Sequence, residues 1–150
     1  MGQTAADFFT PRQKEEITKA IRDAEQKTSG EIRVHLENTC QGDVLDRAAT
    51  IFDKLRMADT DQRNGVLIYL AIKSKKFAIL GDSGINARVP EGFWNQTRDV
   101  MAKHFRDNEF TEGLVKGIAM AAEQLKKYFP WQKEDTNELP NDISFGKNQP

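Results

Sequence analysis

The sequence predicts an α/β domain in which a small mixed sheet is flanked by helices. An apolar run from Val66 to Ile72 is typical of a central strand that is covered on both faces. A strand, a helix and then this strand favour a parallel pair joined by a right-handed crossover. The link from Lys73 to Lys76 is too short for a crossover, so the next strand should be antiparallel. The predicted sheet is a parallel strand pair plus an antiparallel hairpin strand.

The first predicted helix begins at a capping signal. Thr10 supplies a capping hydroxyl, Pro11 occupies the first helical position, and Gln13 lies three residues after the cap. An apolar stripe at helical spacing predicts that this helix extends to about Lys27. Ser29-Gly30 follows as a helix-stop signal.

The first strand, residues 32–36, alternates apolar and polar side chains. The polar set on its second face predicts that this face is partly exposed. That set consists of Arg33, His35 and Glu37. Asp43 then caps a helix predicted over residues 44–55.

Two further helices follow the hairpin. Pro90 is expected to open the first of them and Thr111 the second. Gly113 and Gly117 are expected to let the backbone of the last helix approach the sheet.

The chain is predicted to be one domain with a tail. Residues 1–129 hold all the predicted elements, whereas residues 130–150 are polar, contain two further prolines after Pro130 and show no sustained period. That composition predicts a mobile tail.

Composition excludes several classes of partner. The chain has 22 basic and 23 acidic side chains, so no overall field draws it to nucleic acid or to an anionic membrane. No run of about 18 apolar residues predicts membrane insertion, and no secretory signal is recognisable. A cytoplasmic monomer is the expectation. Cys40 is the single cysteine and is expected to be a small packing residue.

Strand direction predicts that acidic and amide side chains meet at one edge of the sheet. They lie at the start of the first strand, on the approach to the second and after the third. Carboxylate and amide oxygens are the ligands that calcium and magnesium select, so the pattern predicts a divalent-cation site. Its candidate metal ligands are Glu31, Asp59, Asp61, Asn64 and Asp82.

Other roles stay open for each of these residues. Glu31 could be exposed at a strand start, and Asp59 and Asp61 could solvate a loop. Asn64-Gly65 could serve only to form a turn, and the Asp82 carboxylate could hydrogen-bond to the backbone of its own glycine-bounded loop.

Two blocks of sequence, Arg63 to Leu70 and Gly84 to Pro90, are similar to those of the TPM domain family. The resemblance runs from about Pro11 to Phe129. It implies a three-layer α/β/α sandwich, and some relatives are reported to bind calcium or to show acid phosphatase activity. The resemblance also implies a metal-binding role for Asp59, Asp61, Asn64 and Gly65. Where relatives often have glutamate, this chain has Asn86.

Three functional hypotheses result. The first is a calcium-binding, or more generally divalent-cation-binding, domain. The second is a metal-assisted phosphomonoester hydrolase in which Asp82 acts as base or nucleophile. The third is a protein-interaction domain in which a bound cation stiffens a partner-binding loop.

Overall fold

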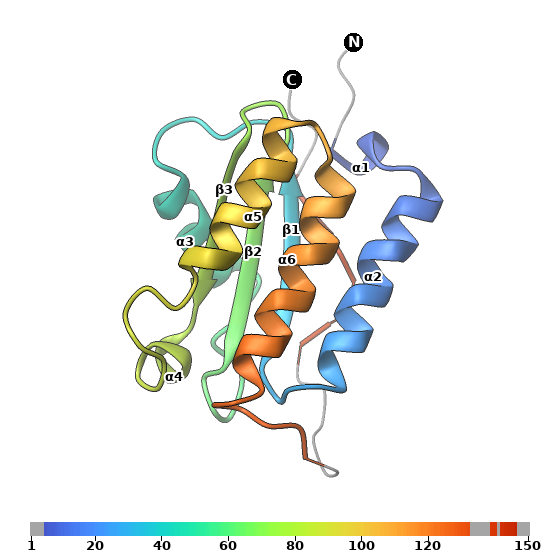
Figure 1. Ribbon diagram of the computed structural model, residues 1–150. Coiled ribbons are helices and arrows are strands. Elements are labelled where there is room, and N and C mark those ends of the chain that lie inside the picture. The colour runs from blue at the N-terminus through green and yellow to red at the C-terminus, as the bar shows by residue number, and fades with distance from the viewer. Residues whose placement is uncertain (1–4, 133–138, 141, 147–150) are drawn as a thin grey trace.

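The computed structural model describes residues 5–132, 139–140 and 142–146 (Figure 1). A four-stranded sheet runs through the middle, with helices packed on both of its faces. In chain order the elements are α1 (Ala5–Phe8), α2 (Pro11–Glu25), β1 (Glu31–Glu37), α3 (Val44–Lys54), β2 (Gly65–Ala71), β3 (Lys76–Gly81), α4 (Ser83–Asn86), α5 (Asn95–Arg106), α6 (Phe110–Leu125) and β4 (Ser144–Phe145).

The sheet has the order β3-β2-β1-β4, and its strand directions are those predicted. β1 and β2 are parallel, with Glu31 opposite Gly65. β2 and β3 form the antiparallel hairpin, with Val66 opposite Gly81. All seven residues of β2 are buried, which confirms a central strand covered on both faces.

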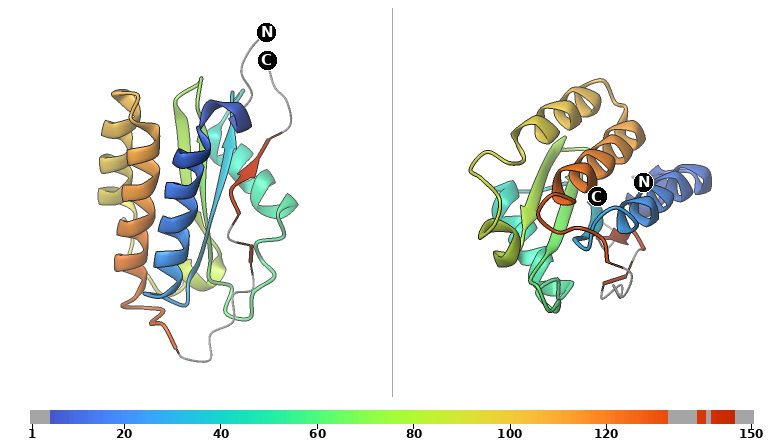
Figure 2. Two further views of the ribbon diagram at one scale, coloured as in Figure 1. Left: turned by 90° about the vertical axis from the view of Figure 1, so that its right-hand side faces the viewer. Right: turned by 60° about the horizontal axis from the view of Figure 1, so that its bottom comes forward.

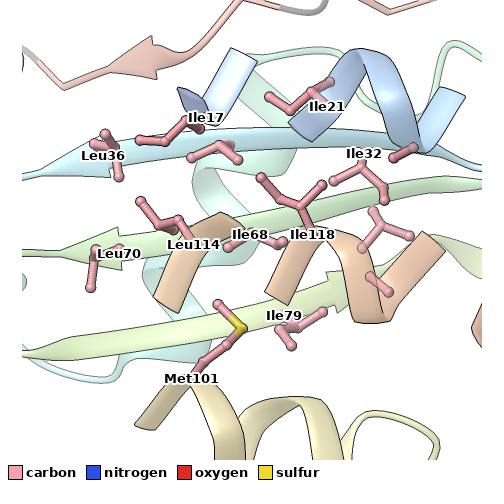
Figure 3. Close-up of a cluster of buried hydrophobic side chains, with 14 of the residues drawn as sticks. Ile17, Ile21, Ile32, Leu36, Ile68, Leu70, Ile79, Met101, Leu114 and Ile118 are labelled. Atoms are coloured by element: carbon pink, nitrogen blue, oxygen red, sulfur yellow. The ribbon is translucent and has the colours of Figure 1, made fainter. Parts of the chain in front are cut away.

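The helices form two layers, as the side view in Figure 2 shows. α2, α5 and α6 cover one face of the sheet, and α3 covers the other. The larger core lies between the sheet and the three-helix layer and is drawn in Figure 3; its members include Ile17, Ile21, Ile32, Leu36, Ile68, Leu70, Ile79, Met101, Leu114 and Ile118. The fold is therefore the three-layer α/β/α sandwich that the family resemblance implies.

Two predicted helix starts are confirmed by their hydrogen bonds. The Thr10 hydroxyl accepts from the Gln13 N–H at 3.1 Å, and the Gln13 side chain accepts from the Thr10 N–H at 2.9 Å. Asp43 Oδ1 accepts from the N–H groups of Leu45 and Asp46, at 2.7 and 3.1 Å. These caps satisfy N–H groups that the first turn of each helix leaves without intrahelical partners.

The helix expected at Pro90 begins at Asn95 instead. Residues 91–94 form turns, and Gly92 adopts a left-handed φ of 76° that an α-helix does not contain. The proline signal marks a turn here, and a short helix, α4, precedes it where the sequence predicts a loop.

The two glycines of α6 serve a different contact from the predicted one. A Cβ at Gly113 would lie 2.5 Å from Phe105 Cε1, and one at Gly117 would lie 2.9 Å from Met101 Cε. Both neighbours belong to α5, so these glycines let α6 approach a helix rather than the sheet.

A strand lies within the segment for which a polar tail was predicted. β4 pairs in parallel with β1 through His35–Ser144 and Leu36–Phe145, and Leu139 is buried in the smaller core. The prediction missed this strand because two paired residues are too few to produce a detectable period. The sheet therefore has one strand more than predicted.

Candidate functional site

Three of the five candidate ligands meet at the end of the sheet where β1 and β2 begin and β3 finishes, here called the starting end. The Glu31 N–H donates to the Asn64 carbonyl at 3.0 Å, and the Asp82 N–H donates to the Gly65 carbonyl at 2.9 Å. Glu31, Asn64 and Asp82 are all buried. The strand register thus holds two carboxylates and one amide at neighbouring positions of the starting end.

Asp82 is engaged by an arginine from the loop before β2. Arg63 Nε lies 2.7 Å from Oδ2 and Arg63 Nη2 lies 2.8 Å from Oδ1, a bidentate pair. Oδ1 also accepts from the Ser83 N–H at 2.7 Å, which caps α4. The hydrogen bonds with Asp82 and its negative charge raise the pKa of the Arg63 guanidinium. In this arrangement the guanidinium neutralises the buried carboxylate.

Glu31 and Asn64 make different contacts. Glu31 Oε1 accepts from the Leu139 N–H at 2.7 Å, so the C-terminal segment covers this carboxylate. The Asn64 side-chain Nδ2 donates to the Ser29 carbonyl at 2.9 Å. Its Oδ1 is buried and has no hydrogen-bond partner among the described residues. A buried amide oxygen without a partner costs free energy, so this atom requires an explanation.

Asp59 and Asp61 are not brought into this buried group. Both are exposed, and Asp59 Oδ2 lies 3.0 Å from Arg56 Nε. Within the described ranges, no three histidine, cysteine, aspartate or glutamate side chains come together as a group able to hold a metal ion. The five candidates therefore do not form a preassembled cage.

The glycine loop after β3 admits the backbone of the preceding loop. A Cβ at Gly84 would overlap the Gln62 carbonyl oxygen and would lie 2.7 Å from that of Arg63. The Gly84 N–H donates to the Arg63 carbonyl at 2.9 Å. Gly84 thus allows residues 62–63 to lie against α4, and this contact positions Arg63 beside Asp82.

The oxygen atoms at the starting end are of the chemical type that a hard cation prefers as ligands. They are carboxylate and amide oxygens, and the Asn64 oxygen is buried without a partner. At Asp82 the Arg63 guanidinium supplies positive charge to both carboxylate oxygens. The donor types therefore match those of a divalent-cation site, and Arg63 already occupies one of them.

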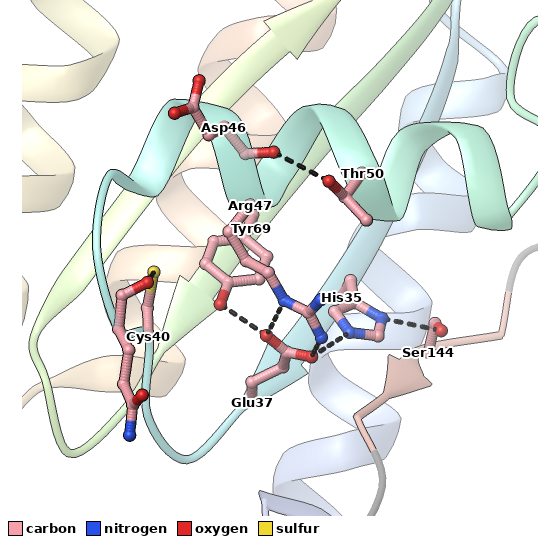
Figure 4. Close-up of polar contacts among 9 residues, drawn as sticks. His35, Glu37, Cys40, Asp46, Arg47, Thr50, Tyr69 and Ser144 are labelled. Carbon is pink, nitrogen blue, oxygen red and sulfur yellow. Dashed lines mark hydrogen bonds and ion pairs between the residues drawn. The ribbon is translucent and has the colours of Figure 1, made fainter.

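A second polar cluster lies under α3, at the other end of β1, and the sequence analysis did not single it out (Figure 4). Its centre is Glu37, which is 1% exposed. Arg47 Nε and Nη2 donate to Oε1 and Oε2 at 3.0 and 2.6 Å, and the Tyr69 hydroxyl donates to Oε1 at 2.5 Å. The carboxylate therefore has a hydrogen bond on each oxygen and a second one on Oε1.

His35 links this cluster to the C-terminal strand. Its Nδ1 is 2.8 Å from the Ser144 hydroxyl. Its Nε2 is 3.3 Å from Glu37 Oε2, within ion-pair distance but not aligned as a hydrogen bond. The sequence predicts partial exposure for this face of β1, yet His35 and Glu37 are buried, because Arg47 and β4 cover them.

The cluster holds Glu37 in its ionised form. Burial raises the pKa of Glu37, but the contact with His35, the hydrogen bonds from Arg47 and Tyr69 and the charge of Arg47 outweigh it and hold that pKa far below the ordinary range. Burial and Glu37 raise the pKa of Tyr69. A carboxylate held this tightly is a poor proton acceptor, so the cluster is structural. One sequence signal pointed to it: a tyrosine inside a buried apolar strand needs a partner for its hydroxyl.

Comparisons with known proteins agree on the fold. The family model described as the TPM domain matches residues 3–124. The NMR structure of BA42 protein from the psychrophilic bacterium Bizionia argentinensis is 52% identical, with a TM-score of 0.88, over 93% of this chain and 96% of that chain. No curated protein gave a match.

Two more distant structures support the fold alone. The N-terminal domain of a P. gingivalis protein is 19% identical, with a TM-score of 0.68, over 83% of this chain and 80% of that one. The N-terminal domain of the cg2496 protein from Corynebacterium glutamicum is 11% identical, with a TM-score of 0.60, over 95% of this chain and 84% of that one. In the described part of the chain, no helix combines the length and apolar character needed to cross a bilayer.

Proposed function

The chain belongs to the TPM domain family, and from that premise we propose that it is a divalent-cation-binding domain whose preferred ion is calcium. Glu31, Asn64 and Asp82 would hold the ion at the starting end of the sheet. Asp59 and Asp61, exposed on the loop that leads to Asn64, would complete the shell from the solvent side.

The observation that carries this proposal is the Asn64 side-chain oxygen, which is buried and has no hydrogen-bond partner among the described residues. It lies at the same end of the sheet as two buried carboxylates. A cation would satisfy this oxygen and offset the repulsion between Glu31 and Asp82.

The geometry favours calcium over magnesium. Calcium accepts six to eight oxygen ligands in flexible arrangements, whereas magnesium demands near-ideal octahedral geometry. The proposed ligands come from three strand ends and from a loop with exposed carboxylates. Because the site is not preassembled, we expect weak binding, with a dissociation constant on the order of 10⁻⁴ to 10⁻³ M.

The geometry gives less support to the two other hypotheses. A hydrolase needs a base or nucleophile with an available oxygen, but both carboxylate oxygens of Asp82 accept from Arg63. The hypothesis of a cation-stiffened interaction loop includes the same cation site, so it is tested first by cation binding itself.

Isothermal titration of the protein with calcium tests the proposal. We expect saturable binding in the wild type and at least about tenfold weaker binding in Asp82→Asn, because a neutral amide replaces a charged ligand. Asp99→Asn is the matched control, since Asp99 is exposed on α5 and is not a proposed ligand. No binding at millimolar calcium, or equal weakening by both variants, would overturn it.

A further inference from the structure

We propose that Arg63 is a built-in competitor for the cation, which occupies Asp82 in the ion-free protein and leaves it when the ion binds. This inference rests on the proposed function and adds its regulation. Arg63 would set the affinity of the site, so that only a sufficient concentration of divalent cation displaces its guanidinium.

The two partners of this pair differ sharply in burial. The Asp82 side chain is 6% exposed, whereas that of Arg63 is 49% exposed. The carboxylate is therefore fixed inside the protein, while its counter-ion lies half in water. Movement of the guanidinium into solvent leaves the buried carboxylate uncompensated, so it is favourable only when another positive charge takes its place.

The backbone of Arg63 is held by contacts that do not depend on its pair with Asp82. Its carbonyl accepts from the Gly84 N–H at 2.9 Å, and its own N–H donates to the Thr60 carbonyl at 3.2 Å. Its φ of 51° lies in the left-handed region, which non-glycine residues adopt only when their surroundings enforce it. Release of Asp82 thus requires rotation of the side chain alone.

Arg63, the proposed competitor, and Asn64, the proposed ligand without a hydrogen-bond partner, are consecutive residues. Asn64 follows Arg63 directly and carries the buried oxygen that has no hydrogen-bond partner. A cation that binds Asn64 and Asp82 together would meet the positive charge of Arg63 at the same carboxylate. The Nε and Nη2 contacts occupy both oxygens of Asp82, so the guanidinium and the ion compete for the same atoms.

Electrostatics gives the size of the effect. Two unit charges about 4 Å apart repel by about 1 kcal/mol in water and more near a protein surface, and a divalent ion doubles that repulsion. Removal of the Arg63 charge should therefore tighten calcium binding by roughly tenfold or more.

Calcium titrations of Arg63→Gln and Arg63→Lys test the proposal. The glutamine variant loses the charge and should bind calcium about tenfold more tightly, whereas the lysine variant keeps the charge and should stay within about threefold of the wild type. Arg12→Gln is the matched control, because Arg12 pairs with the exposed Glu16, which is not a proposed ligand, and should change affinity little. Amide spectra of each variant verify that the fold is kept.

A double-mutant cycle locates the effect at Asp82. The gain from Arg63→Gln should disappear in the Asp82→Asn background, since no carboxylate is then left to compete for. In the wild type, the Arg63 Nε–H resonance should shift towards that of a solvent-exposed guanidinium as calcium is added.

The outcomes separate this inference from the proposed function. Calcium binding that is equal or weaker in Arg63→Gln, or an Nε–H resonance that calcium does not move, would overturn competition and leave cation binding standing. If neither the wild type nor Arg63→Gln binds calcium, both the inference and the proposed function fail.

Discussion

The buried carboxylate of Glu37 makes Arg47→Gln the sharpest stability experiment on this fold. Glu37 is 1% exposed, and Arg47 donates two hydrogen bonds to it, at 3.0 and 2.6 Å. Removal of one partner of a buried pair costs about 3 to 5 kcal/mol, because the remaining charge is left uncompensated. The Arg47 side chain is 31% exposed, so water can partly replace it, and we expect a loss near the lower limit, about 3 kcal/mol.

Urea denaturation and thermal unfolding measure this loss directly. For a chain of this size, about 3 kcal/mol corresponds to a fall in Tm of roughly 6 to 12 °C. Arg22→Gln is the matched control: Arg22 lies at the same 2.6 Å from Glu15, but the two side chains are 47% and 66% exposed. We expect that control to cost at most about 1 kcal/mol.

The pH dependence gives a second readout. The pKa of Glu37 is lowered in the folded protein, so its ionised form stabilises the fold at neutral pH, and that stability is lost as the pH falls below the ordinary glutamate range towards the folded pKa. In Arg47→Gln the uncompensated carboxylate should take up a proton more readily. The stability gap between the two proteins should therefore narrow as the pH is lowered through and below the ordinary glutamate range. A gap below about 1 kcal/mol at neutral pH, or one that does not change with pH, would refute the reasoning.

Two glycine substitutions should also destabilise the fold, each through a named contact. Gly84→Ala would bring a Cβ against the carbonyl oxygens of Gln62 and Arg63, which are backbone atoms that cannot rotate away, and we expect a loss of at least about 2 kcal/mol by urea denaturation. Gly117→Ala would press on Met101, a flexible side chain, and we expect a smaller loss of about 1 kcal/mol in the same assay, because methionine can repack. If Gly117→Ala costs more than Gly84→Ala, the distinction between rigid and flexible neighbours is wrong.

The main elements of the fold follow from local signals in the sequence. The capping residues Thr10 and Asp43 predict the starts of α2 and α3, and the short link after the apolar run predicts the hairpin. Strand direction then brings Glu31, Asn64 and Asp82 to one end of the sheet. These features depend on neighbouring residues, so composition and spacing reveal them.

The features that were missed depend on contacts between distant segments. The Leu139 contact with Glu31 joins residues 108 positions apart in the sequence, and β4 pairs with residues of β1 that are 109 positions away. The Arg63 pair with Asp82 depends on the fit of Gly84 against residues 62–63, which spacing does not encode. Glu37 seemed partly exposed because the alternation of β1 gives no sign of Arg47 and β4 above it. Sequence patterns locate the candidate ligands but not the groups that already occupy them.

The most direct test of cation binding at the starting end is a calcium titration followed by amide chemical shifts across the whole chain. The account predicts that the shifts cluster at residues 29–31, 59–65 and 81–84, which converge only in the folded protein. Shifts spread evenly over exposed acidic residues such as Asp99, or none at millimolar calcium, would contradict it.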